Sequence, residues 1–282
     1  MKKIAVIGAT GMLGLPAVRA LCAAGFEVTA LARNAQAAAK SLPEQVRVVA
    51  ADVYDEDSLR RGFAGQDALY LNLAVAPGAR EGDLHTEAQG LALILAAAAA
   101  AGIAHIGYVS ALIHDSPEQW WVLDLWRRAV QAVKAGPIPS TIFYLANVME
   151  TLPERHIVGG VLALPGSSLF PNYWIAGADF GAQVARAFAL PAENSREFVI
   201  QGPEPITYRE AGERYAAAKG LRVVTVPVTA LAALGLISRP TAFNARMMRT
   251  VLGYREEFKA AATWEALGRP TMTIEDFARS AR

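Results

Sequence analysis

The stretch VIGATGMLGLPAVRAL, residues 6–21, decides the fold. An apolar run ends at Gly8, two more glycines follow at three-residue spacing, and a stretch with helical periodicity comes next. A strand that turns through such glycines into a helix is typical of a phosphate-binding turn. Gly8 permits the tight turn, Gly11 lets backbone N–H groups approach a pyrophosphate, and Gly14 permits close helix–strand packing. The helix N-terminus adds partial positive charge, so this stretch predicts a dinucleotide site.

Apolar strand patterns alternate with helical patterns over the first half of the chain. Strands are expected at 3–8, 26–33, 46–52, 67–75, 103–112 and 140–148, and helices at 13–25, 34–42, 55–62, 84–102 and 117–136. Strands that are apolar throughout are buried on both faces. The alternation therefore predicts an α/β fold with a doubly wound parallel sheet of the Rossmann type. Residues 1–150 would form the dinucleotide-binding core, and residues 151–282 a smaller C-terminal, substrate-side lobe that returns one strand near 196–202 to the sheet edge.

Composition excludes several classes of protein. The 282 residues are 53% hydrophobic and 19% charged with a net charge of +1, which suits a well-packed soluble chain. No cluster of Lys and Arg indicates a nucleic-acid or membrane-surface partner. The apolar segment 91–104 is too short to span a bilayer. Cys22 is the single cysteine, so no internal disulfide can form and a cytoplasmic location is expected. Four histidines and one cysteine show no metal-ligand spacing, and no metal is expected.

The ends of the predicted strands indicate which dinucleotide binds. Arg33 follows the second strand, where an NAD enzyme would carry an acid, and a guanidinium suits the 2′-phosphate of NADP(H). NADP(H) is therefore expected to be preferred over NAD(H), the alternative being a solvated loop arginine. Asp52 could accept a hydrogen bond from the adenine amino group, or serve as a helix cap or turn residue. The other expected contacts of the dinucleotide are Thr10, Met12, Leu13, Val53, Leu73, Ala74 and Val75.

The chain resembles the NmrA-like group of atypical short-chain dehydrogenases/reductases over nearly its whole length. The resemblance is carried by GATGMLG, AAAAAAGIAHIGYVSAL, STIFYLANVME, VIQGPEPITYREAGE and TWEALGRPTMTIEDFA. It implies the doubly wound fold and dinucleotide binding. The group includes both reductases and dinucleotide-sensing regulators, so the resemblance leaves the activity open.

The resemblance also suggests residues for chemistry. Ser110 ends the fifth strand where the larger family places its active-site serine, where it could polarise a carbonyl, contact the nicotinamide, or only bond to backbone. The family's Tyr and Lys, four residues apart, are missing from the helix WWVLDLWRRAVQAVK. Tyr215 and Lys219 have that spacing but lie on a later segment, and we expect a non-catalytic surface helix there.

Other residues near the predicted strand ends are further candidates. Tyr144 and Asn147 are expected to face the nicotinamide. His85 and His114 should lie at the carboxyl edge of the sheet, where either could protonate a product or be structural. The catalytic candidates are thus Ser110, His85, His114 and Tyr144. His105, at the start of a strand, is expected to face solvent.

Two functions remain open at this stage. Trp120, Trp121, Trp126 and Trp174 could line a pocket for a small apolar or aromatic substrate, covered by the stripe Phe243, Met247, Val251, Tyr254 and Phe258, or both sets could be core packing. The first function is an NADPH-dependent reductase of a small, electron-poor, quinone-like acceptor. The second is a non-catalytic NADP(H)-binding redox sensor that acts through a protein partner. The aromatic-rich second half favours the enzyme, the missing Tyr and Lys favour the sensor, and an isomerase-type activity is a third alternative.

Overall fold

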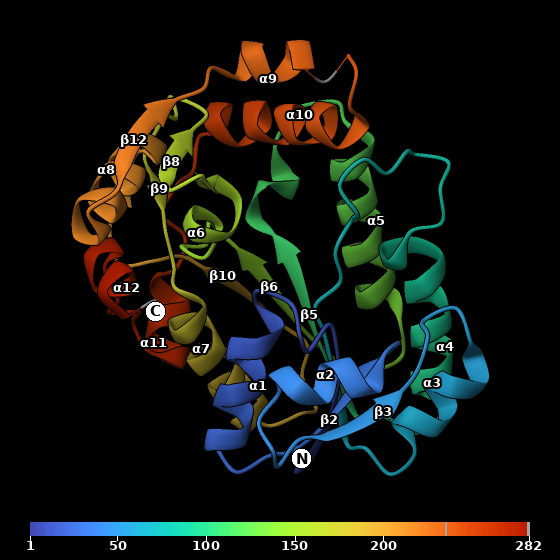
Figure 1. Ribbon diagram of the computed structural model, residues 1–282. Helices are drawn as coiled ribbons and strands as arrows, with labels where there is room; N and C mark the ends of the chain where they lie inside the picture. Colours follow the sequence, from blue (N-terminus) through green and yellow to red (C-terminus); the bar gives the residue numbers. More distant parts are fainter. Residues whose placement is uncertain (235, 281–282) are drawn as a thin grey trace.

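A seven-stranded sheet forms the centre of the computed structural model, which describes residues 1–234 and 236–280 (Figure 1). The strand order is β3-β2-β1-β4-β5-β6-β10, and every neighbouring pair is parallel. The strands are β1 (Lys3–Ile7), β2 (Glu27–Ala32), β3 (Arg47–Ala50), β4 (Ala68–Leu71), β5 (His105–Ala111), β6 (Ser140–Leu145) and β10 (Arg196–Ile200). The order reverses between β1 and β4, which confirms the doubly wound α/β fold expected from the alternating pattern.

Helices cover both faces of this sheet. One face packs against α1 (Gly14–Ala23), α2 (Ala35–Ser41) and α7 (Gly177–Ala189), with α11 (Ala261–Leu267) behind α7. The other face packs against α3 (Glu56–Phe63), α4 (Leu91–Ala100) and α5 (Trp121–Ala135). Each layer buries its own apolar cluster against the strands, so the sheet is inaccessible on both faces and only its strand ends remain open.

Capping side chains define where several helices begin. The Asn34 side chain accepts a hydrogen bond from the Ala37 N–H at the start of α2, and Asp55 accepts from Asp57 and Ser58 at the start of α3. Helix α8 (Tyr208–Lys219) begins with a reciprocal capping box between Thr207 and Glu210. Such caps satisfy N–H groups that the first turn of a helix leaves free.

The C-terminal lobe has a core of its own. A three-stranded sheet of β12 (Arg222–Thr225), β8 (Val161–Leu164) and β7 (Ile157–Val158) packs with α8 and α12 (Ile274–Ser280) around Trp174 and Tyr215. The remaining elements are α6 (Thr151–His156), the strand pair β9 (Asn172–Tyr173) and β11 (Pro205–Ile206), α9 (Val228–Leu234) and α10 (Arg239–Gly253). Helices α9 and α10 lie at the end of the molecule away from the N-terminus (Figure 1).

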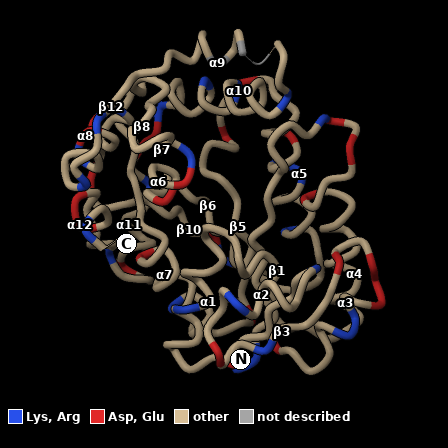
Figure 2. The backbone as a smooth tube through the Cα atoms, in the orientation of Figure 1, with Lys and Arg blue, Asp and Glu red and all other residues tan. Residues whose placement is uncertain are grey.

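The chain crosses between the two parts more than once. The strand expected near 196–202 is β10, and it occupies the sheet edge beside β6, as expected. Helix α7 also returns to the main sheet, where it packs on α1. The division at residue 150 therefore stays a prediction about folding units. Lys, Arg, Asp and Glu are scattered over the periphery of both parts (Figure 2), and the helices of the described residues are all too short or too polar to cross a bilayer.

Three sequence expectations differ from the structure. Strands β4 and β6 end earlier than expected, at Leu71 and Leu145, because the chain beyond them turns along the carboxyl edge of the sheet. The helix expected at 84–102 begins as a π-helical turn, Thr86–Gly90, before α4. The expectation that His105 faces solvent is wrong: its side chain is buried between Ala192 O and Thr141 Oγ1.

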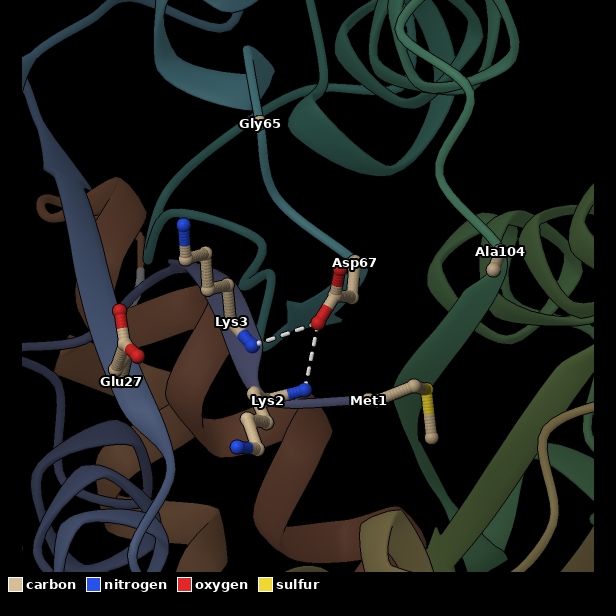
Figure 3. Close-up of a pocket in the computed structure, with 7 residues that line it drawn as sticks. All are labelled: Met1, Lys2, Lys3, Glu27, Gly65, Asp67 and Ala104. Atoms are coloured by element: carbon tan, nitrogen blue, oxygen red, sulfur yellow. Dashed lines mark hydrogen bonds between the residues drawn. The ribbon is translucent and has the colours of Figure 1, made fainter.

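A hollow of about 460 Å³ at the amino ends of the strands is structural (Figure 3). Within it, the Asp67 carboxylate accepts the backbone N–H groups of Lys2 and Lys3 at 2.6 and 3.0 Å. These two bonds hold the pKa of Asp67 below its usual range. The carboxylate thereby ties the start of β1 to the start of β4, at the edge of the sheet opposite to the one where doubly wound folds bind ligands.

Two buried histidines should make stability depend on pH. Burial lowers the pKa of both His105 and His156, so the folded state holds these rings neutral. Below about pH 6.5 the unfolded chain takes up protons that the folded chain does not. As the pH decreases below about 6.5, the free energy of unfolding should therefore decrease, by up to about 1.4 kcal/mol per pH unit for each histidine.

Urea unfolding between pH 5 and 8 measures this dependence. The double variant His105→Gln/His156→Gln should be less stable at pH 7.5 and lose part of the slope below pH 6.5. The difference between variant and wild type isolates the histidines from the acidic groups. An unchanged slope in the double variant would contradict the assignment.

Candidate functional site

A cavity of about 620 Å³ opens at the carboxyl ends of the central strands. The glycine turn after β1, the ends of β4, β5 and β6, and side chains of α6 and α10 form its walls. The lining residues that the sequence predicted as dinucleotide contacts are Gly8, Thr10, Gly11, Met12, Leu13, Leu73, Ala74, Val75, Ser110 and Asn147. Their meeting in one cavity follows from the parallel topology, which brings the carboxyl ends of all these strands to one edge.

The glycines of the turn serve two different needs. Gly8 has φ +83°, and a Cβ there would overlap the Asn72 carbonyl oxygen. A Cβ on Gly14 would overlap the Gly8 carbonyl oxygen, so this position must also stay bare for the backbone to pack. A Cβ on Gly11 would meet nothing closer than Gly8 O at 3.4 Å. The protein's own packing therefore does not require Gly11, and its exposed backbone faces the cavity.

At the ends of β5 and β6, two buried polar atoms of lining residues lack a hydrogen-bond partner. Ser110 Oγ, at the end of β5, and Asn147 Nδ2, just after β6, make no hydrogen bond within residues 1–234 and 236–280. The Ser110 side chain is 5% exposed, so the alternative of a backbone-bonded serine does not hold. Unsatisfied buried groups are costly, by about 1–3 kcal/mol each. Such a cost at the cavity wall is typical of groups that bind a ligand.

The wall opposite the glycine turn is apolar. It consists of Trp126 from α5 and a stripe on α10 that comprises Phe243, Met247, Met248 and Val251. Helix α10 is held over the cavity by the segment before α5, since the Thr250 hydroxyl donates to Glu118 at 2.7 Å and Arg246 donates to Gln119 O at 3.0 Å. The cavity therefore has a polar side at the strand ends and an apolar side at α5 and α10.

The predicted aromatic lining is correct in part. Trp126, Phe243, Met247, Val251 and Tyr254 face the cavity. Trp174 is buried in the core of the C-terminal lobe, and Trp120 and Trp121 pack against Phe243 from behind. Phe258 meets the edge of Trp264 outside the cavity and is exposed. The alternative of core packing therefore holds for Trp120, Trp121 and Trp174, and for Phe258 neither expectation holds.

Five predicted dinucleotide contacts lie outside the cavity lining: Gly14, Arg33, Asp52, Val53 and Tyr144. Gly14 is the first residue of α1, where it packs on the turn. Arg33 is exposed at the end of β2, and Asp52 accepts the Tyr54 N–H at 3.0 Å in a turn after β3. Val53 lies beside Gly90. Arg33, Asp52 and Val53 follow the carboxyl ends of β2 and β3, and their contacts with a dinucleotide stay predictions.

Three of the four catalytic candidates do not reach the cavity. His85 is buried against the Trp121 ring, with 4.9 Å between ring centroids. His114 stacks on Tyr144, with 4.8 Å between centroids, and the Tyr144 hydroxyl donates to Glu197. Glu197 also pairs with Lys134 of α5, so the Tyr144 hydroxyl is engaged with β10, and Tyr144 is not among the lining residues. Ser110 alone among the candidates lines the cavity.

The Tyr215–Lys219 pair is not part of the cavity wall either. Tyr215 is 1% exposed and packs against Phe277 in the core of the C-terminal lobe. The expectation of a surface helix is therefore wrong for this side chain. Its place in a core agrees with the prediction that the pair is not catalytic.

Several lining residues escaped sequence analysis. Asn72 directly follows the apolar run of β4, and Glu87 is the one acid in an otherwise apolar helical stretch, so both carried a local signal. Glu87 accepts the Thr86 hydroxyl at 2.8 Å, and burial raises its pKa. Asn172 begins the two-residue strand β9, and Glu256 lies in the irregular segment after α10, far away in the chain. No periodicity or motif marks them, and only the folded chain brings them together.

Comparisons with known proteins agree with this geometry. A curated (4-alkanoyl-5-oxo-2,5-dihydrofuran-3-yl)methyl phosphate reductase from Streptomyces griseus is 27% identical over 291 residues, covering 97% of this chain and 96% of the relative. An NAD(P)H azoreductase from Xenophilus azovorans is 23% identical, covering 98% and 97%.

Solved structures share the fold. The Citrobacter sp. triphenylmethane reductase complexed with NADP(H) has a TM-score of 0.75 at 19% identity, with 99% of this chain and 100% of that chain covered. The NADPH-dependent quinone oxidoreductase of Escherichia coli complexed with NADPH has a TM-score of 0.70 at 21% identity, with 98% and 99% covered. A family model, the NmrA-like family, matches residues 1–276. This chain belongs to the NmrA-like family.

Proposed function

We propose that this protein uses NADPH to reduce a small, flat, electron-poor acceptor of the quinone type. The observation that carries the proposal is the pair of unpartnered buried atoms, Ser110 Oγ and Asn147 Nδ2, at the ends of adjacent strands in a cavity with an apolar opposite wall. Polar donors on one wall of the cavity suit a carboxamide or carbonyl group of a ligand. The apolar wall suits a ligand ring that packs against it.

The residues present fit a dinucleotide cofactor. Gly11 leaves its backbone bare although the protein's own packing does not require this, and α1 begins three residues later. A pyrophosphate would lie against this turn, where helix N–H groups and the helix dipole favour negative charge. The exposed guanidinium of Arg33 stands at the end of β2, where the 2′-phosphate of NADP(H) would be held. NADPH is named in the Escherichia coli and Citrobacter neighbours, which supports this choice.

The chemistry needs positioning and exclusion of water. When bound, NADPH supplies a hydride to the acceptor. Ser110 and Asn147 would orient the polar groups at the strand ends, and Phe243, Met247 and Val251 would keep water from the reacting face. Helix α5 carries no tyrosine, so no Tyr and Lys pair can act from it. The reductases among the curated relatives and the dye and quinone reductases among the structural neighbours support an acceptor with extended conjugation.

The acceptor proposal is tested by NADPH oxidation, measured at 340 nm, against menadione, benzoquinones and azo and triphenylmethane dyes. We expect saturable oxidation with at least one quinone, and its loss on Val251→Asp, which places a charge in the apolar wall. Arg249→Asp, on the same helix but outside the cavity lining, is the matched control. Tight NADPH binding without turnover of any acceptor would contradict the reductase and favour the alternative of a redox sensor with a protein partner.

Two glycine variants separate ligand binding from packing. Gly11→Val should weaken NADPH binding at least about tenfold in calorimetry, because a branched side chain would enter the pyrophosphate path, while the unfolding midpoint stays close to wild type. Gly14→Ala should lower stability by about 1–3 kcal/mol, since its Cβ would overlap the Gly8 carbonyl. An unchanged affinity of folded Gly11→Val for NADPH would contradict the prediction that this turn binds the pyrophosphate.

Arg33→Ala tests the choice between cofactors. Loss of a charge-assisted hydrogen bond of about 1.5–3 kcal/mol should weaken NADPH binding about ten- to a hundredfold and leave NADH binding nearly intact. Arg47→Ala is the control, because Arg47 is equally exposed but begins β3 at the opposite edge of the sheet. Equal affinity of the wild-type protein for NADPH and NADH would contradict the preference.

A further inference from the structure

A partly buried carboxyl group lines the cavity on the side of the C-terminal lobe. Glu256 follows α10 and lies over the ends of β10 and β9. Its Oε1 accepts the side-chain N–H of Gln201, the residue next after β10, at 2.7 Å. Its Oε2 accepts the backbone N–H of Tyr173 at 3.2 Å. With Asn172, Glu256 forms part of the cavity wall.

Asn172 connects this carboxyl group with the strand ends. Its side chain is 1% exposed and is hydrogen-bonded to Glu256. Its Oδ1 has no partner among the described residues. Three residues further on, the Ile175 N–H donates to Asn147 O at 2.9 Å, so this segment runs alongside the end of β6. Ser110, Asn147, Asn172 and Glu256 thus line one cavity, and the first three each carry an unpartnered buried polar atom.

Asn172 can satisfy Glu256 in both of its protonation states. The amide nitrogen donates to the carboxylate. After a turn of the amide, its oxygen, otherwise unpartnered, can accept from the carboxylic acid. A purely structural contact needs only one of these arrangements.

Burial raises the pKa of Glu256 to about 7, although the hydrogen bonds from Gln201, Tyr173 and Asn172 oppose the shift. Asp115 of the segment after β5 adds to the rise. The other charged or titratable groups around it are Tyr254, which donates to Asp115 at 2.6 Å, Lys259, which lies 3.5 Å from Asp115, and exposed Glu257. Near neutral pH, Glu256 is therefore able both to give and to regain a proton.

We propose that Glu256 is the proton donor for the acceptor, with Asn172 as its positioning residue. The inference rests on the proposed reductase function. The acceptor gains a hydride, and its carbonyl oxygen then carries the added electron pair. The Glu256 O–H bond breaks, its electron pair stays on the carboxylate, and the proton passes to that oxygen. The carboxylate regains a proton from water. The acceptor thus gains two protons and two electrons, which is two hydrogen atoms in all, and the dinucleotide is oxidised by two electrons.

The assignment also narrows the class of acceptor. A molecule that spans from the ends of β5 and β6 to Glu256 must carry a carbonyl oxygen conjugated with the carbon that receives the hydride. Quinones and conjugated enones meet this condition. A saturated ketone does not, since its reacting carbon and its oxygen are directly bonded.

Glu256→Gln and its neighbour control Glu257→Gln test the role. With an accepted quinone, Glu256→Gln should lower kcat about a hundredfold, the lower part of the range for general acids, and leave the KM for NADPH within about twofold. In the wild type, kcat should fall as the pH rises through about 7. This decrease of kcat with rising pH should be absent in Glu256→Gln, present again in Glu256→Asp, and the same as in the wild type in Glu257→Gln.

A binding measurement gives a readout that does not depend on turnover. Calorimetry of menadione with the wild-type protein and NADP⁺, in two buffers of different ionisation enthalpy at pH 7.5, should show proton uptake, because a quinone oxygen prefers the protonated acid. Glu256→Gln should bind without it. Binding to the wild type without proton uptake overturns the donor role even if the variants fail to fold.

The outcomes separate the two proposals. A wild type that reduces no acceptor contradicts the reductase, and the donor role with it. A wild type that turns over while folded Glu256→Gln keeps its full rate and its pH profile contradicts the donor role alone.

Discussion

The close approach of the chain after β4 to the turn after β1 is the constraint on which the site depends. The Asn72 N–H donates to Ile7 O at 3.1 Å, and the Asn72 carbonyl fills the space that a side chain at position 8 would need. Gly14 in turn packs against the Gly8 carbonyl. These backbone contacts bring the turn after β1 and the end of β4 together where the strand order reverses, and the exposed main chain of Gly11 is left open to a ligand there.

The cavity wall changes from polar to apolar between the glycine turn and α10. Polar groups with no partner follow at the ends of β5 and β6, and the apolar stripe of α10 lies across from them. The two layers of helices cover both faces of the sheet, so polar and apolar lining residues can meet a ligand at the ends of the strands. Under the proposed function, the doubly wound core would hold the dinucleotide and the C-terminal lobe would contribute the side chains that select the acceptor.

Sequence reasoning succeeded where a local pattern has one structural solution. The glycine turn, the alternating strands and helices and the late edge strand were predictable because each depends on neighbours in the chain. It failed for Tyr144, because the position at a strand end was visible but its bond to Glu197 on another strand was not. His105 failed for the same reason, since its partner Ala192 lies 87 residues away. Asn172 and Glu256 gave no signal, since their proximity arises from tertiary packing alone.

The surroundings of Glu256 favour a chemical role for this residue over a structural one. An ionised carboxylate buried in a wall costs free energy even when it is hydrogen-bonded, and the raised pKa of Glu256 is the direct expression of that cost. Glutamine has nearly the same volume and could accept from Gln201 without any charge. A site selected for stability alone would favour the amide, because protein stability and function commonly oppose each other at such positions. The acid is explained if its proton is needed: under the proposed function the apolar side chains of α10 keep water from the reacting face, so a proton must reach the acceptor through a side chain, and Glu256 regains it from water on its solvent side.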